Sequence, residues 1–180
     1  MSKFGRTLTM KNHISVVLVS LLVLSLGSCL EKQDFPNEPK LEFVGFSQAV
    51  PQGAIDSIGV VHLTFTDGDG NLGLNISDST GRFHPDSFYN TNLFIFPFKK
   101  IEGVFEPAFV FTDNHVRISP RLSDSDNPIE GDIDASVLYP ARTSLDVSDT
   151  VTLKWEIYLV DRDFNHSNII TTPEVTYEWP

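Results

Sequence analysis

The sequence predicts an all-β protein whose folded part is an antiparallel, immunoglobulin-like β-sandwich of about seven to eight strands. Three observations support this fold class. Apolar and polar residues alternate in several short segments, which is the pattern of a strand with one buried face. Clusters of Asp, Gly, Asn, Ser and Pro separate these segments. No segment has the apolar period of an amphipathic helix, so the sequence disfavours a helical class.

The predicted strands follow one another along residues 41–180, which is enough chain for one domain with its own core. The clearest alternation runs from Val151 to Leu159. In order, the predicted strands are residues 41–46, 61–65, 93–98, 104–111, 116–119, 129–137, 151–159 and 175–179, of which the first, fifth and sixth have the weaker patterns. Short strands separated by turns favour a sandwich, with a small barrel as the alternative.

Residues 1–28 have the plan of a bacterial lipoprotein signal peptide. Their charged residues are all basic, namely Lys3, Arg6 and Lys11. The apolar run that follows, residues 14–26, is shorter than the about 20 residues of a membrane-crossing helix. Residues 26–29 then read Leu-Gly-Ser-Cys, which resembles the lipobox in which the cysteine is lipidated after cleavage.

Cys29 is the single cysteine of the chain, so it has no disulfide partner within the chain. Lipidation of Cys29 accounts for a lone thiol in an oxidising compartment, and a plain secretory signal is the alternative. Residues 29–40 are polar and rich in proline, which predicts an extended tether. We therefore expect a lipid anchor in the cell envelope, at the outer membrane, on either its periplasmic or its exposed face.

The mature chain is strongly acidic. Removing residues 1–28 takes away three of the 13 basic residues and none of the 24 acidic ones, so the formal net charge changes from −11 to −14. Such a surface repels nucleic acid and anionic headgroups and attracts cations. The sequence therefore predicts no nucleic-acid partner.

The segment after the predicted strand 61–65 is a candidate calcium loop. Asp67, Asp69 and Asn71 place oxygen donors at every second position, as calcium loops do. Further candidate ligands are Gly73, through its backbone carbonyl, Asn75 and Asp78. The loop departs from an EF-hand, because Leu72 stands where that loop has glycine and no helices flank it.

Two other interpretations fit this segment. Asp and Gly can simply form a tight turn, with Leu72 and Leu74 covering the end of the sandwich. Gly68, Gly70 and Gly73 also match a dinucleotide-binding spacing, but no helix follows to face the phosphates. Calcium and the plain turn therefore remain open, and a nucleotide site is disfavoured.

No catalytic motif is present in the sequence. It lacks G-x-S-x-G and H-E-x-x-H, and its histidines do not have a paired metal spacing. His62 is expected on the outer face of a strand and His166 in the last turn. The alternative is a secreted hydrolase acting on a glycan or peptide, which requires histidines or carboxylates to converge in one cleft.

A family resemblance rests on the lipobox, on residues 65–73 and on the segment from Trp155 to Asn168. In that segment a strand runs into a turn that contains Asp161, Asn165 and Ser167. Together these features resemble small immunoglobulin-like, fibronectin-III-like lipoproteins of Bacteroidota. The resemblance implies a fold and a compartment and transfers no activity. We therefore expect a lipid-anchored, non-catalytic binding or accessory module, with Ca²⁺ as candidate cofactor and an envelope protein or glycan as candidate partner.

Overall fold

The structure, a computed structural model, describes residues 34–49, 58–108, 114–120, 127–139 and 148–178. The segment Asp34–Pro180 forms one unit. The predicted signal peptide, Cys29 and the first part of the predicted tether lie outside the described residues. Within the described part of the chain, no helix is long and apolar enough to cross a membrane.

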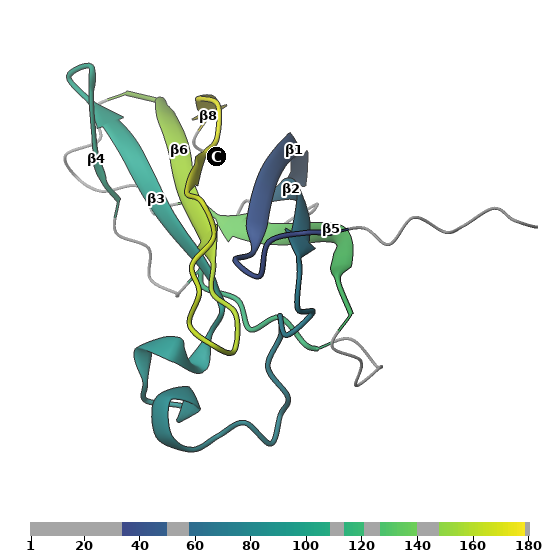
Figure 1. Ribbon diagram of the computed structural model, residues 1–180. Coiled ribbons are helices and arrows are strands. Elements are labelled where there is room, and N and C mark those ends of the chain that lie inside the picture. The colour runs from purple at the N-terminus through teal and green to yellow at the C-terminus, as the bar shows by residue number, and fades with distance from the viewer. Residues whose placement is uncertain (1–33, 50–57, 109–113, 121–126, 140–147, 179–180) are drawn as a thin grey trace, which may run out of the picture. The chain divides into compact units, whose positions relative to one another are not determined.

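Eight strands form two antiparallel sheets in the described residues (Figure 1). The first sheet has the order β1-β2-β5 and consists of β1 (Lys40–Ala49), β2 (Ile58–Asp67) and β5 (Ile129–Leu138). The second has the order β4-β3-β6-β7, with β8 also paired to β6, and consists of β3 (Leu93–Ile101), β4 (Val104–Pro107), β6 (Thr150–Leu159), β7 (Ile170–Thr171) and β8 (Val175–Glu178). Every pairing is antiparallel, so the predicted all-β class is confirmed.

The two sheets share one apolar core. Along β6, every second side chain from Val151 to Leu159 is buried, as the alternation predicted. Trp155 lies at the centre of this row and is fully buried. Phe46 reaches Trp155 from β1 in the other sheet and stacks on its ring at 5.4 Å between centroids. The core therefore depends on contacts between strands that are far apart in the sequence.

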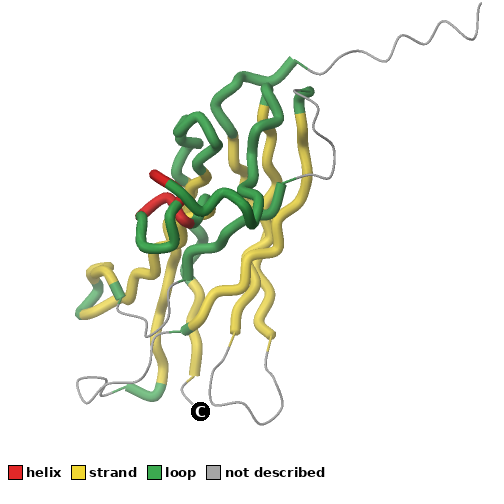
Figure 2. The backbone as a smooth tube through the Cα atoms, turned by 90° about the horizontal axis from the view of Figure 1, so that it is seen from below, coloured by secondary structure: helices red, strands yellow, loops and turns green. Residues whose placement is uncertain are grey.

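The long connection from β2 to β3 contains two short 3-10 turns, η1 (Gly81–Phe83) and η2 (Phe88–Asn90), drawn in red in Figure 2. Arg117 fastens this connection. Its guanidinium donates hydrogen bonds to the backbone carbonyls of Asn75, Asp78 and Asn90 at 2.6, 2.7 and 2.6 Å. A single side chain thus provides hydrogen bonds to three backbone carbonyls of this connection.

The predicted strand at residues 116–119 does not form. Val116 makes one isolated bridge with Leu93, through two backbone hydrogen bonds of 2.8 and 2.9 Å. The ladder ends there because the amide of Ile118 donates to the side-chain oxygen of Asn92 at 2.6 Å instead of to a neighbouring strand. The predicted strand at residues 104–111 is described only as far as Pro107, where β4 ends.

The last turn of the chain is tied to the first strand. The amide of Leu41 donates to Asn168 Oδ1 at 2.9 Å, and Asn168 Nδ2 donates to the Leu41 carbonyl at 3.0 Å. The Asn168 side chain therefore pairs with the backbone of β1 as a neighbouring strand would. The predicted tether, which precedes β1, is also held to the domain: the amide of Gly68 donates to the Pro36 carbonyl at 2.8 Å.

Candidate functional site

Three carboxylates meet where the turns after β2 and β6 lie at the same end of the two sheets (Figure 1). Asp67 is the last residue of β2, Asp69 follows in the turn, and Asp161 comes shortly after β6 ends. One oxygen of each carboxylate lies within 4.8 Å of the others. The cluster therefore draws on both sheets and joins residues that are distant in the sequence.

The hydrogen bonds within the two turns hold these carboxylates in place. Asp67 Oδ2 accepts the amide of Leu72 at 2.9 Å, which closes the turn after β2. Asp161 accepts the backbone amide of Asn165 at 2.8 Å and its side-chain amide at 2.7 Å, which closes the turn after β6. Asp67 Oδ1 is buried and has no hydrogen-bond partner among the described residues.

Burial sets the charge state of the cluster. Asp67 is 0% exposed and Asp161 is 2% exposed. The pKa of Asp67 is raised from 3.8 to about 7, mainly by burial. The negative charges of Asp69 and Asp161 and a side-chain hydrogen bond with Asp69 contribute to this rise, while the hydrogen bond from the Leu72 amide opposes it. Burial also raises the pKa of Asp161, against the two hydrogen bonds from Asn165. Close, buried, like-charged oxygens of this kind suit a hard divalent cation.

The remaining predicted ligands lie in different surroundings. Asn71 Nδ2 donates to Asp163 at 3.1 Å, while Asn71 Oδ1 is buried with no partner among the described residues. Gly73 is buried at a φ of 107°, with Pro120 and Ser119 against it. Asn75 and Asp78 lie in the Arg117 contact, and the Asp78 carboxylate pairs with Arg162. The structure thus groups Asp67 and Asp69 with Asp161, which was not among the metal ligands predicted from the sequence.

Glycine is required at two positions of the turn after β2. A side chain at Gly68 would meet the backbone carbonyls of Phe35 and Pro36, where the tether crosses the turn. Gly70 has a φ of 69°, and a side chain there would meet the Asn127 carbonyl. The turn is therefore enclosed on two sides by backbone. Leu72 and Leu74 are buried beneath it, as the plain-turn interpretation also expects.

A second polar arrangement lies across the first sheet, on the face that points away from the core. His62 Nε2 lies 2.8 Å from Ser47 Oγ, and His62 Nδ1 lies 2.6 Å from Asp134 Oδ1. The three residues come from β1, β2 and β5. The His62 side chain is 36% exposed and that of Asp134 is 71% exposed, so the row lies open to solvent. The order hydroxyl, imidazole, carboxylate is that of a nucleophilic triad.

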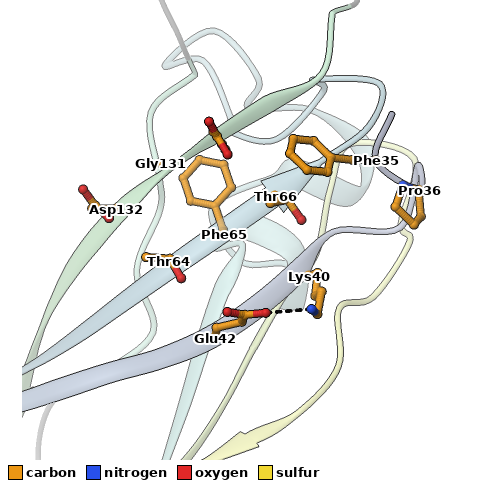
Figure 3. Close-up of a pocket in the computed structure, with 10 residues that line it drawn as sticks. Phe35, Pro36, Lys40, Glu42, Thr64, Phe65, Thr66, Gly131 and Asp132 are labelled. Carbon is orange, nitrogen blue, oxygen red and sulfur yellow. Dashed lines mark hydrogen bonds and ion pairs between the residues drawn. The ribbon is translucent and has the colours of Figure 1, made fainter. Parts of the chain in front are cut away.

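A pocket of about 850 Å³ opens where the tether reaches the first sheet (Figure 3). Phe35 and Pro36 of the tether and Phe65 of β2 supply its apolar lining. Its other lining residues are Lys40, Glu42, Thr64, Thr66, Glu130, Gly131 and Asp132. Lys40 Nζ and Glu42 Oε1 form an ion pair of 2.6 Å along this lining. No sequence motif predicted this pocket, because four separate segments contribute to it.

Comparisons of the chain with protein-family models, with curated proteins and with solved structures found no match.

Proposed function

We propose that the chain is a lipid-anchored, non-catalytic binding or accessory module of the bacterial cell envelope, held at the outer membrane by lipid on Cys29. The observation that carries this proposal is the pocket whose apolar wall includes the end of the tether (Figure 3). Phe35 is only six positions after Cys29. A chain of six residues spans at most about 20 Å, so a lipid on Cys29 keeps the pocket close to the membrane surface.

The charges around the pocket indicate the chemistry of its partner. The lining residues include three carboxylates, on Glu42, Glu130 and Asp132, and one cation, Lys40. Lys40 is already paired with Glu42, so the lining has an excess of negative charge. A basic, extended segment of another envelope protein complements this lining, whereas anionic headgroups and nucleic acid are repelled. Phe35 and Phe65 provide rings against which an aliphatic stem or a cationic head can pack.

Site-specific photo-crosslinking in intact cells tests this proposal. A photoreactive residue placed at Thr66, which lines the pocket, is expected to give one adduct with an envelope protein; the control position is Asp86, whose side chain is 93% exposed and lies outside the pocket. Asp132→Lys, compared with Asp86→Lys, is expected to abolish the adduct by repelling a basic segment. An adduct that a glycosidase removes indicates a glycan partner, and identical adducts from both positions count against a binding pocket.

Fractionation of the same cells tests the anchor. Cys29→Ser removes the acceptor sulfur, so the protein is expected to move from the membrane fraction to the soluble fraction, and the Thr66 adduct is expected to disappear. Wild-type protein from the membrane is expected to have an intact mass that includes acyl chains. A Cys29→Ser protein that stays with the membrane contradicts the lipid anchor, whatever the crosslinking shows.

We infer further that the two sheets form an immunoglobulin-like sandwich of the fibronectin-III type. The order β1-β2-β5 corresponds to strands A, B and E, and the order β4-β3-β6-β8 to C′, C, F and G. One departure is the position of the buried tryptophan. Trp155 lies on β6, the equivalent of strand F, rather than on the equivalent of strand C.

A second candidate function is hydrolysis, since Ser47, His62 and Asp134 have the contacts of a nucleophilic triad. In that role Ser47 Oγ attacks an acyl carbon and His62 takes the hydroxyl proton, while Asp134 orients the imidazole. His62 then gives the proton to the leaving group as its bond to the acyl carbon breaks, and water releases the acyl group from Ser47. A fluorophosphonate probe is expected to label wild-type protein and to fail with Ser47→Ala if the row is catalytic. The matched control is Ser136→Ala, another exposed serine of the first sheet. Equal labelling of wild type and Ser47→Ala removes this candidate.

A further inference from the structure

We propose that Asp67, Asp69 and Asp161, together with the side-chain oxygen of Asn71, bind one Ca²⁺ ion that ties the turn after β2 to the turn after β6. This site differs from the loop site that sequence spacing predicts, because its third carboxylate comes from the other sheet. It goes beyond the proposed partner-binding role, since none of the four proposed ligands lines the pocket.

The first argument is a buried carboxylate oxygen that receives no hydrogen bond from a donor group. Asp67 is fully buried, and no donor among the described residues reaches its Oδ1. The side chain within hydrogen-bond reach of this carboxylate is a second carboxylate, Asp69. A buried carboxylate oxygen without a partner loses its hydrogen bonds to water and gains none in return, which destabilises the fold. Proteins therefore rarely bury such an oxygen unless a ligand or an ion completes its surroundings.

A second orphaned oxygen lies in the same turn. Asn71 Oδ1 is buried without a partner among the described residues, while its Nδ2 donates to Asp163. That hydrogen bond fixes the amide group and links the turn after β2 to the turn after β6. Asn71 and Asp67 are thus two residues of one turn whose free oxygens are both shielded from solvent.

The third argument is uncompensated charge. The charged groups that act on the Asp67 carboxylate are two other carboxylates, Asp69 and Asp161. The nearest arginine along the chain, Arg162, is paired with Asp78. Among the described residues, no basic side chain forms an ion pair with any of the three clustered carboxylates. Buried carboxylates are stable when paired or when they coordinate a metal.

The donor chemistry selects the ion. All of the contributing atoms are hard oxygens from carboxylates and an amide, and no histidine or cysteine takes part. Calcium accepts six to eight such oxygens at about 2.3–2.6 Å in flexible geometry. Magnesium demands a near-ideal octahedron, and zinc prefers nitrogen and sulfur. Oxygen donors from two separate turns, which need not form a regular octahedron, therefore suit calcium best.

Calcium binding by the full-length lipidated protein in detergent tests the proposal. Titration calorimetry after treatment with chelator is expected to give one Ca²⁺ per chain, with much weaker Mg²⁺ binding. Asp161→Asn is expected to weaken the affinity at least about tenfold, and Asp86→Asn, a change at a well-exposed loop residue, is expected to leave it unchanged. Calcium is also expected to raise the melting temperature of wild type far more than that of Asp161→Asn.

Two outcomes overturn the site. One is the absence of calcium binding at millimolar concentration in a protein whose circular dichroism shows intact strands. The other is stoichiometric binding that Asp161→Asn and Asp67→Asn leave unchanged, which places the ion elsewhere. Either result leaves the membrane anchor and the crosslinking at Thr66 untouched, so failure of this site is distinguishable from failure of the proposed function.

Discussion

The Asp67 side chain combines full burial with a negative charge. A buried negative charge is destabilising, and the neighbouring acidic residues Asp69 and Asp161 add to this effect by repulsion. Without a cation, the fold tolerates Asp67 best in its neutral form. The charge of this one residue therefore couples the stability of the domain to pH and, through the proposed site, to calcium.

The first prediction follows from the direction of the Asp67 pKa shift. The pKa is about 7 in the fold against an ordinary 3.8, so the folded state holds this proton more tightly. The stabilisation is fully present below the ordinary pKa and is lost as the pH rises towards 7. In chelator, we expect Asp67→Asn to melt at the wild-type temperature at about pH 4 and at a higher temperature at about pH 8.

Thermal melts of both proteins across this pH range provide the measurement. The difference between wild type and Asp67→Asn separates the effect of this residue from that of the carboxylates outside the cluster, which titrate equally in both proteins. Calcium is expected to reverse the order at about pH 8, because only wild type retains the ligand charge. A difference that is constant with pH shows that Asp67 ionises normally in the fold.

At the scale of the element, the turn after β2 is fixed by its contact with the tether. We expect Gly68→Ala to destabilise the domain by about 1–3 kcal/mol, because the added carbon meets the carbonyls of Phe35 and Pro36. Gly45→Ala is the matched control. Its nearest contact is 4.0 Å from a His62 carbon, so its effect is expected to stay within about 0.5 kcal/mol. Urea unfolding of the two variants compares them directly, and equal midpoints contradict this account.

The alternation of apolar and polar residues predicted a strand well where one face of that strand packs against the other sheet. β6 is the clearest case, since residues 151–159 alternate in the sequence and in the structure. Residues 116–119, whose strand pattern is weaker, form only one bridge, because the side chain of Asn92 accepts the hydrogen bond from the amide of Ile118. A side-chain acceptor from a distant loop is a tertiary effect that no local pattern reveals.

The candidate metal site was predicted only in its local half. Asp67 and Asp69 are two residues apart, so their proximity follows from the sequence. Asp161 joins them because β2 and β6, in different sheets, both end at the same end of the domain. The sequence signal available for it was an Asp-Arg-Asp turn after an alternating strand. Choosing Asp161 from that signal required the order of the strands in both sheets.

At the scale of the whole molecule, the acidic charge and the proposed anchor would act together. The predicted mature chain has a net charge of −14, which would repel an anionic membrane surface, while acyl chains on Cys29 would hold the domain next to it. The described part of the predicted tether is bound to the domain, since Pro36 accepts the Gly68 amide and Phe35 lines the pocket. The pocket would therefore stay within about 20 Å of the attachment point.

The pairing of Asn168 with Leu41 bears on the order in which the native contacts can form. The two residues are 127 positions apart, yet the side-chain amide of one completes the backbone pairing of the other. In a chain that is synthesised from its N-terminus, this contact cannot form until residue 168 has been made. Until then the backbone of Leu41 at the edge of β1 is open to pairing with other chains.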